Sequence, residues 1–309
     1  MFFLYQLITS ILVIISPIVI IYRILINKED KKRFLEKFSF YSKLKKEGKL
    51  IWFHGASVGE ILSIIPLIKH YEKNKSIKQI LITSSTLSSS KVLKKYKFKK
   101  TIHQFYPIDH FIFTKKFLDY WKPDLSIFID SEIWPCMYKK LYEKNIPLVL
   151  LNARLTNRSF KNWIKLKNFA KSVFNKITIA YPQNLETKNY LNQFDLKKIK
   201  MIGNLKFAEN YEEKLIRINK RLEKELKSKK IWIASSTHKK EEVFCAKTHL
   251  ELKKRVKNLI TIIIPRHIHR LNEIKTEINN FDLNVSCHSS RVNNLKKVDI
   301  YIVDTFGET

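Results

Sequence analysis

The segment LIWFHGASVGEILSIIPLIKH, residues 50–70, joins an apolar run, a glycine-containing turn and an amphipathic stretch. The apolar run at residues 50–53 is typical of a buried strand. After the turn, four isoleucines recur at the spacing of one helical face: Ile61, Ile64, Ile65 and Ile68. Gly55 and Gly59 lie in the turn although the chain has only 5 glycines, which indicates a sharp bend or a close approach of a ligand to the backbone. The segment predicts a strand, a turn and a helix with Glu60 at its start.

The same alternation of apolar runs and amphipathic stretches continues along the chain. Seven apolar runs precede residue 205: LIWFH, QILIT, IHQFY, LSIFID, PLVLLN, ITIAY and KIKMIG. Alternating strands and helices imply right-handed crossovers and a parallel sheet that is covered on both faces. We therefore predict an α/β fold with a Rossmann-like domain at residues 35–205.

A second α/β series follows a linker and a highly charged helix, which we expect together at residues 206–228. Its apolar runs are IWIASS, LITIIIP, LNVSC and DIYIVD. The series predicts a second, incomplete domain at residues 229–309, because the sequence stops at Thr309 with no helix left to cover that face of the sheet. Two similar domains would place a cleft between two sets of strand ends.

The N-terminal segment is apolar enough for a membrane. Residues 1–22 carry no charged side chain, and a helix of this length crosses a hydrocarbon layer of about 30 Å, with a possible kink at Pro17. A signal peptide would begin with basic residues, whereas here the positive charges follow the apolar segment: Arg23, Lys28, Lys31, Lys32 and Arg33. We predict an uncleaved anchor at residues 1–27, with a cleaved signal or an interfacial helix as alternatives.

The chain is strongly basic, with 59 Lys and Arg against 28 Asp and Glu and a formal net charge of +31. This imbalance favours polyanions or anionic lipid headgroups. The lysines are spread along the chain, so a bias of an AT-rich genome explains part of the excess. The 3 cysteines have no ligand-like spacing, which argues for a reducing compartment and against zinc or a disulfide framework.

Polar residues directly after the predicted strands are the candidates for a site, because ligands of open α/β sheets bind beyond the carboxyl ends of strands. Ser57 and Glu60 have the spacing of a helix capping box, which is the structural alternative to a function. Glu132, in IDSEIWP with Asp130, either caps the next helix or binds a donor group. Arg154 is a potential anion clamp or a solvated arginine. In GNLKF, Lys206 would reach a cleft between the domains, although lysine is common throughout this chain.

The second series offers further candidates at its strand ends. The segment SSTH, residues 235–238, is expected to open a helix whose N–H groups hold phosphate oxygens, although helix capping alone would favour the same residues. Arg266 and His267 follow the next strand, and Gly307 and Glu308 follow the last. His267 and His269 lack a third nearby ligand, so we predict no metal site. The commonest nucleotide-binding, protease and hydrolase signatures are absent.

Seven motifs resemble those of the transferases of 3-deoxy-D-manno-octulosonic acid (Kdo), in the same order after an N-terminal hydrophobic segment: IWFHGASVGE, IDSEIWP, LVLLNARL, IGNLKF, ASSTHKKEE, IIIPRH and VDTFGE. The resemblance covers essentially the whole chain. It implies a GT-B fold of two Rossmann-like domains and an inverting transfer of Kdo from CMP-Kdo to a lipid A precursor. It also implies action at the cytoplasmic face of the inner membrane, without a nucleotide-chelating metal or other cofactor.

The resemblance also implies roles for individual residues. Glu60 matches the catalytic base, and Glu132 and Lys206 match the positions regarded as transition-state stabilisers. The positions that match CMP contacts are Pro265, Arg266, Phe306, Gly307 and Glu308. A carboxylate at a helix N-terminus has a lowered pKa, whereas a base needs a pKa nearer neutrality, so we expect burial and the neighbouring Glu132 to raise the pKa of Glu60.

The sequence departs from the family pattern at two places. Ser235-Ser236-Thr237-His238 stands where the family usually has Gly-Ser-Thr-His. The family also continues past the last motif with a Gly- and Asn-rich loop that ends in a glutamate. We therefore expect a fragment of a longer enzyme, with an inactive membrane-bound remnant that binds anionic lipid as the alternative. Nucleic-acid binding has no support beyond the charge, because no recognition motif occurs.

Overall fold

The computed structural model describes residues 1–205, 220–290 and 295–305. The chain divides into two compact units, Met1–Asn210 and Tyr211–Thr309.

Unit 1 is built on a parallel sheet with the strand order β3-β2-β1-β4-β5-β6. The strands are β1 (Lys49–His54), β2 (Ile77–Ser84), β3 (Thr101–Phe105), β4 (Leu125–Ile129), β5 (Leu148–Ala153) and β6 (Ile179–Pro182). The helices are α1 (Phe2–Leu25), α2 (Val58–Lys73), α3 (Leu87–Leu93), α4 (Phe111–Trp121), α5 (Pro135–Glu143), α6 (Asn157–Ile164), α7 (Lys167–Phe174) and α8 (Leu185–Asn192), with a 3-10 helix η1 (Phe34–Phe38). The order reverses between β1 and β4, and at such a switch point the loops after both strands diverge and leave a crevice.

The two faces of this sheet bury different sets of side chains because successive residues of a strand point in opposite directions. Leu50 and Trp52 of β1 belong to a large core cluster on one face, together with Phe117 of α4 and Met137 of α5. Ile51 and Phe53 belong to the cluster on the other face, which includes four isoleucines of α2: Ile61, Ile64, Ile65 and Ile68. The predicted helical face is therefore confirmed, and burial of each isoleucine stabilises the fold by roughly 1.5–3 kcal/mol.

One predicted strand is wrong. The run KIKMIG, residues 198–203, forms only an isolated bridge between Ala180 and Ile199 and adds no strand to the sheet. Its Lys and Gly residues interrupt the apolar pattern, so the segment has too little apolar surface to bury as a seventh strand.

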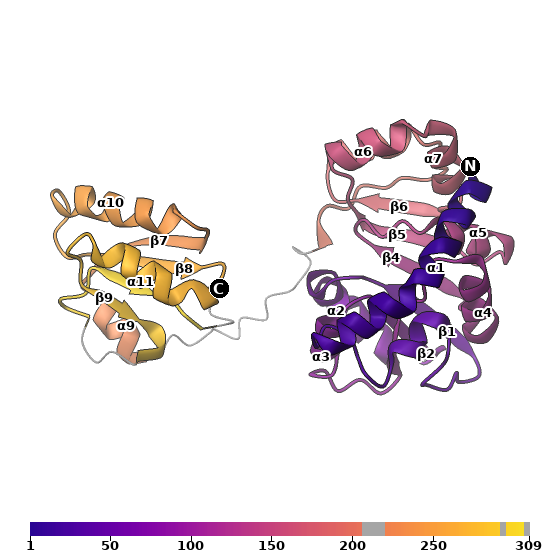
Figure 1. Cartoon of the computed structure of the whole chain (residues 1–309), viewed down its shortest axis with the longest axis horizontal. Helices are drawn as coiled ribbons and strands as arrows, with labels where there is room; N and C mark the ends of the chain where they lie inside the picture. Colours follow the sequence, from indigo (N-terminus) through magenta and orange to yellow (C-terminus); the bar gives the residue numbers. More distant parts are fainter. Residues whose placement is uncertain (206–219, 291–294, 306–309) are drawn as a thin grey trace. The chain divides into compact units, whose positions relative to one another are not determined.

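Helix α1 is long and apolar enough to cross a membrane, with a mean hydropathy of 2.4. It also packs on the rest of unit 1, across which it runs diagonally in Figure 1. The Phe2 ring meets Phe169 of α7 edge to face at 5.1 Å, and the Tyr5 hydroxyl donates to Asp109 Oδ2 at 2.8 Å. Most other side chains of α1 are exposed, which leaves a large apolar surface outside the protein core.

Unit 2 has a parallel sheet with the order β7-β8-β10-β9. Its elements are α9 (Lys220–Leu226), β7 (Lys230–Thr237), α10 (Glu241–Lys253), β8 (Leu259–Pro265), η3 (Ile268–Arg270), α11 (Leu271–Asn279), β9 (Val285–Cys287), η4 (His288–Ser290) and β10 (Ile300–Ile302). One core cluster joins the sheet to α10 and α11 through Ala246, Ile274 and Ile300. The second series therefore forms an α/β layer structure of its own (Figure 1).

Candidate active site at the switch point of unit 1

Glu60 lies in the first turn of α2, directly beyond β1. Ser57 is the N-cap residue, and its Oγ accepts from the Glu60 amide at 3.3 Å. The Glu60 carboxylate in turn accepts from the Ser57 hydroxyl at 2.7 Å (Oε1) and from the Ala56 amide at 2.7 Å (Oε2). The predicted capping box is thus present with one difference. The carboxylate accepts from the amide of Ala56 and not from the amide of the N-cap residue Ser57. Each oxygen retains a lone pair, so capping leaves Glu60 able to accept a proton.

The pKa of Glu60 is raised above its ordinary value. Burial of the carboxyl is the largest cause, and the nearby Glu132 and Asp130 charges raise the pKa further. The hydrogen bonds from Ser57 and Ala56 act in the opposite direction but do not offset the burial. The direction agrees with the expectation from the sequence, and it makes Glu60 a better base at neutral pH than an exposed glutamate.

The two glycines of the turn differ in the space that a side chain would have at each position. A Cβ on Gly55 would lie 3.1 Å from Glu60 Cβ and 3.4 Å from Ile61 Cδ1, so a side chain there would press on Glu60. A Cβ on Gly59 would meet nothing within 4 Å. Packing therefore explains Gly55, while the space beside Gly59 is open to a ligand.

Glu132 lies beyond the end of β4, the strand next to β1. Its Oε2 is 3.0 Å from His54 Nε2 and accepts from Trp134 Nε1 at 2.8 Å. The Tyr138 hydroxyl donates to the Glu132 carbonyl at 2.7 Å, which fixes the backbone as well. Oε1 has no protein partner among the described residues. The Glu132 carboxylate is thus held through one of its two oxygens.

His54 connects the two strand ends. It is the last residue of β1, lies beside Phe128 of β4 and is fully buried. Its ring stacks on Tyr106 at 3.8 Å, and its Nδ1 lies 3.0 Å from Thr83 Oγ1. An ionised carboxylate only accepts hydrogen bonds, so a hydrogen bond from His54 to Glu132 requires a proton on Nε2. From the sequence, no role was expected for His54 or Trp134, although they lie in the motifs IWFHGASVGE and IDSEIWP.

The end of β5 brings a third set of polar groups to the same edge. Asn152, which has a positive φ of 54°, donates through Nδ2 to Asp130 Oδ1 and accepts from the Leu205 amide at 2.9 Å through Oδ1. The hydrogen bond from the Leu205 amide ties the chain just before Lys206 to the sheet edge that carries Asp130. Lys206 itself lies outside the described residues. Arg154 is exposed, which agrees with both alternatives, an anion clamp and a solvated arginine.

In unit 2 the structure places the SSTH and PRH segments side by side. Thr237 pairs with Pro265 at the ends of β7 and β8, and the Arg266 amide donates to the Thr237 carbonyl at 3.0 Å. Pro265 is buried and the Arg266 side chain is exposed. Phe306, Gly307 and Glu308 lie outside the described residues, although β10, which precedes them, lies next to β8.

The expectation that SSTH opens a helix needs a correction. Strand β7 continues through Thr237, and α10 begins only at Glu241 with Lys240 as its N-cap residue. The His238 amide donates to Glu241 Oε2 at 2.8 Å, so the first turn of the helix already occupies that donor. Ser236 has a φ of 59°, a conformation that favours glycine and that Ser tolerates at some cost in strain.

No group of three or more His, Cys, Asp or Glu side chains with metal-binding geometry occurs in the part of the chain that the structure describes.

Comparison with known proteins places this geometry in a family. A family model described as 3-deoxy-D-manno-octulosonic-acid transferase (kdotransferase) matches residues 32–209. The chain is 35% identical to the 3-deoxy-D-manno-octulosonic acid transferase of Rickettsia bellii, over 99% of this chain and 73% of that protein. It is 29% identical to the enzyme of the same name from Haemophilus influenzae, over 86% of this chain and 64% of that protein.

The fold is similar to that of a solved structure with a different activity. The UDP-GlcNAc 2-epimerase from Neisseria meningitidis aligns with 83% of this chain and 72% of its own, at 13% identity and a TM-score of 0.54. This likeness shows a GT-B-like α/β fold and nothing about the substrate. Together, the family match and the similarity to the Rickettsia enzyme show that this chain is a glycosyltransferase and belongs to the Kdo transferase family.

Proposed function

We propose that the chain transfers Kdo from CMP-Kdo to a lipid A precursor with inversion of configuration, and that Glu60 is the catalytic base. The observation that carries this proposal is the geometry of the switch point. There, Glu60 has a raised pKa and lies close enough to Glu132, at the carboxyl ends of two neighbouring strands, for the Glu132 charge to contribute to that shift.

In the proposed reaction the acceptor hydroxyl attacks the anomeric carbon of Kdo on the face opposite CMP. Glu60 takes the hydroxyl proton as the new carbon–oxygen bond forms, and the bond to the CMP phosphate breaks, so that CMP leaves with its electron pair. The open space beside Gly59 lets the acceptor approach Glu60. Inversion follows because a single displacement occurs at the anomeric carbon.

Glu132 has a different role in this proposal. Its negative charge raises the pKa of Glu60, and its Oε1, which has no partner among the described residues, is proposed to stabilise the positive charge that develops on the sugar ring. Lys206 and Arg266 are proposed to balance the Kdo carboxylate and the departing CMP. Donor binding is assigned by resemblance to Pro265, Arg266, Phe306, Gly307 and Glu308. No metal or other cofactor takes part in the proposed reaction.

The proposed location is the cytoplasmic face of the inner membrane. The apolar helix α1 supports attachment to the lipid, and the basic residues that follow it favour the cytoplasmic side. The acceptor lipid would then be presented in the same membrane. The basic surface of the chain would face anionic headgroups and the phosphates of the acceptor.

The test is CMP-Kdo-dependent modification of a lipid A precursor by membranes that contain the full chain. We expect Glu60→Gln to lower kcat by about 10²–10⁴-fold, because it removes the base but keeps the size of the side chain. Glu186→Gln is the matched control, since Glu186 lies in the first turn of α8 and is exposed. Its activity should equal that of the wild type.

Two results would count against the proposal in different ways. A Glu60→Gln enzyme with the wild-type rate would show that another group takes the proton. A wild-type chain that binds lipid but transfers no Kdo would favour the inactive remnant that the sequence left as an alternative.

A further inference from the structure

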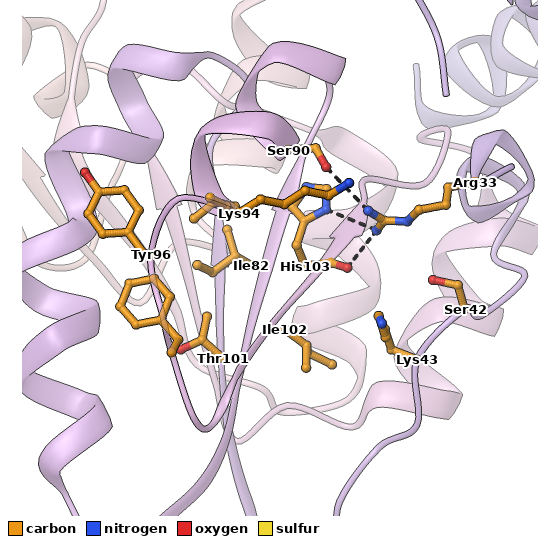
Figure 2. A pocket seen from close by; sticks show the side chains of 12 residues that line it. Arg33, Ser42, Lys43, Ile82, Ser90, Lys94, Tyr96, Thr101, Ile102 and His103 are labelled. Atoms are coloured by element: carbon orange, nitrogen blue, oxygen red, sulfur yellow. Dashed lines mark hydrogen bonds between the residues drawn. The ribbon is translucent and has the colours of Figure 1, made fainter. Parts of the chain in front are cut away.

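Unit 1 contains a cavity of about 450 Å³ at the β3 edge of its sheet, away from the proposed base. The cavity lies between α3, strand β3 and the segment that follows α1, as Figure 2 shows. Neither Glu60 nor Glu132 lines it. Its volume falls within the range of about 300–1,000 Å³ that is usual for small-molecule sites.

The cavity has a cationic rim. Lys43 and Lys94 line it, and neither ammonium group has a protein partner among the described residues. Arg33 also lines it but is already bound, since it pairs with Glu36 at 2.8 Å and donates to the His103 carbonyl at 2.7 Å. Burial and the Arg33 and Lys94 charges lower the pKa of His103 to about 3, so this ring is neutral. No described lining residue is acidic, so the net charge of the lining is positive.

The opposite part of the cavity is apolar. Tyr96 and Phe98 stack at 5.6 Å between ring centroids, and Ile82, Leu93 and Ile102 contribute aliphatic surface. Figure 2 shows Tyr96 at one end of the cavity and the group of Arg33, Ser90 and His103 at the other. A ligand that satisfies both ends is an anion with an apolar tail.

The cavity borders the segment that follows α1, a helix with the composition of a membrane helix, and this position favours a lipid over a soluble metabolite. Arg33, which follows the apolar helix α1, donates to Ser90 Oγ at 3.4 Å and so ties the segment after that helix to α3. The neighbouring Ser89 donates to the Ala56 carbonyl at 3.3 Å, in the turn that carries Glu60. Helix α3 therefore separates the cavity from the proposed catalytic turn and contacts both.

We propose that this cavity binds a phosphate-bearing acyl lipid, with the phosphate against Lys43 and Lys94 and the first part of an acyl chain against Tyr96 and Phe98. Two sources share this chemistry: a membrane phospholipid and the lipid acceptor of the transfer. The second source rests on the proposed function, whereas the binding itself does not.

The test uses the full chain in nanodiscs of phosphatidylcholine, titrated with water-soluble dihexanoyl phosphatidic acid by calorimetry. We expect saturable binding that becomes about tenfold weaker in the double variant Lys43→Gln/Lys94→Gln, because two ionic contacts are lost. The matched control is Lys46→Gln/Lys95→Gln, which removes the same charge from exposed neighbours that do not line the cavity. Equal affinities of the two double variants would overturn the proposal.

A second variant tests the apolar part. Ile102→Trp fills the cavity from β3 without changing the charge, and it should weaken binding of the phosphatidic acid at least tenfold while the chain stays folded. Inorganic phosphate should bind the wild type far more weakly than the lipid does. If phosphate alone binds as tightly, or if Ile102→Trp has no effect, the acyl lipid assignment is wrong.

Competition then identifies the source. If the lipid is the acceptor, the Lys43→Gln/Lys94→Gln enzyme has a raised KM for the lipid A precursor with an unchanged kcat, and phosphatidic acid competes with that precursor. If the lipid is a membrane phospholipid, phosphatidic acid still binds the wild type but does not compete with the lipid A precursor. The KM of the double variant for that precursor then equals the KM of the wild type. Both results support the cavity assignment, and loss of Kdo transfer alone would bear only on the proposed function.

Discussion

At the scale of single residues, the two oxygens of Glu132 have different surroundings. Oε2 is bonded to His54 and Trp134, whereas Oε1 has no partner in the described part of the protein. Hydrogen bonds to a charged group contribute about 1.5–3 kcal/mol each, so the two donors favour the carboxylate in one orientation. We therefore propose that His54 and Trp134 are positioning residues that act through Glu132.

The first prediction concerns Trp134→Phe. This change removes the donor to Oε2 but keeps an aromatic ring beside Tyr106, whose ring centroid lies 5.3 Å away. We expect kcat for Kdo transfer to fall about tenfold with little change in KM, because a loosened Glu132 no longer holds its charge at the reacting carbon. Steady-state kinetics with a lipid A precursor measures this effect.

A control separates positioning from general loss of stability. Trp163→Phe in α6 alters a tryptophan that packs against Phe174 and has no hydrogen bond to any site residue that the structure describes. This variant should retain the wild-type kcat. If both variants lose activity equally, the effect of Trp134→Phe is one of folding and not of Glu132.

At the scale of elements, Asp109 joins α1 to α5. Its carboxylate accepts from the amides of Cys136 and Met137 at 3.0 and 2.8 Å, in the first turn of α5, and from the Tyr5 hydroxyl of α1. Burial raises the pKa of Asp109 to about 6 because it outweighs these three hydrogen bonds. One buried carboxylate therefore caps the helix that follows Glu132 and holds the N-terminal helix.

The second prediction is a pH dependence of stability that Asp109 causes. Its folded pKa is above the unfolded value, so the folded state binds the proton more tightly, and this contribution is lost as the pH rises from about 4 through about 6. The unfolding free energy of the wild type, relative to that of Asp109→Asn, should fall by up to about 3 kcal/mol across this window. Urea unfolding at several pH values measures the difference, and a constant difference would contradict the assignment.

Helix α1 leads to a third prediction. Its first ten residues contact the rest of unit 1 through Phe2, Tyr5 and Ser10. The Ser10 hydroxyl oxygen lies 3.2 Å from His110 Nε2. The sequence predicts that α1 spans the membrane in a single pass. In that case Phe169, Asp109 and His110 would have to lie at membrane depth or lose their contacts with the helix. The contacts favour a helix that lies in the membrane interface with its exposed side toward the lipid.

The measurement is labelling of a cysteine inserted between Met1 and Phe2, at the N-terminal end of α1. In intact cells we expect no reaction with a membrane-impermeant maleimide, and reaction after the cytoplasm is opened. The native cysteines are buried and give a low background. Labelling in intact cells would show that α1 spans the inner membrane.

At the scale of the whole molecule, we expect two independent contributions to lipid binding, one from the charge of +31 and one from the apolar surface of α1. The contribution of the charge requires anionic headgroups and is screened by salt. The contribution of the apolar surface does not require anionic headgroups and is not screened by salt. The two contributions can be separated by mutation, since Ile14 and Ile18 are 76% and 71% exposed and therefore support no packing inside the protein.

The fourth prediction uses Ile14→Lys/Ile18→Lys. The wild type should bind neutral and anionic vesicles, whereas this variant should bind only anionic vesicles and dissociate as the salt rises from about 0.1 to about 1 M. Vesicle sedimentation measures both. A variant that still binds neutral vesicles would show that another apolar surface of the chain attaches it.

Local patterns in the sequence determined much of this protein. The strand, turn and helix at residues 50–70 and the capping of α2 by Ser57 and Glu60 were predicted correctly, because periodicity and capping depend on neighbouring residues. The KIKMIG strand and the helix opening at SSTH were wrong, because an apolar or polar composition alone does not say whether a sheet edge or a helix start is available.

Only the tertiary structure decided which distant residues meet. The strand order places β1 beside β4, so His54 reaches Glu132 although 78 positions separate them. The docking of Tyr5 on Asp109 and the cavity between Arg33 and α3 likewise join segments that are far apart in the sequence. Pairing of parallel strands and packing of helices depend on the folded chain as a whole, and no local pattern encodes them.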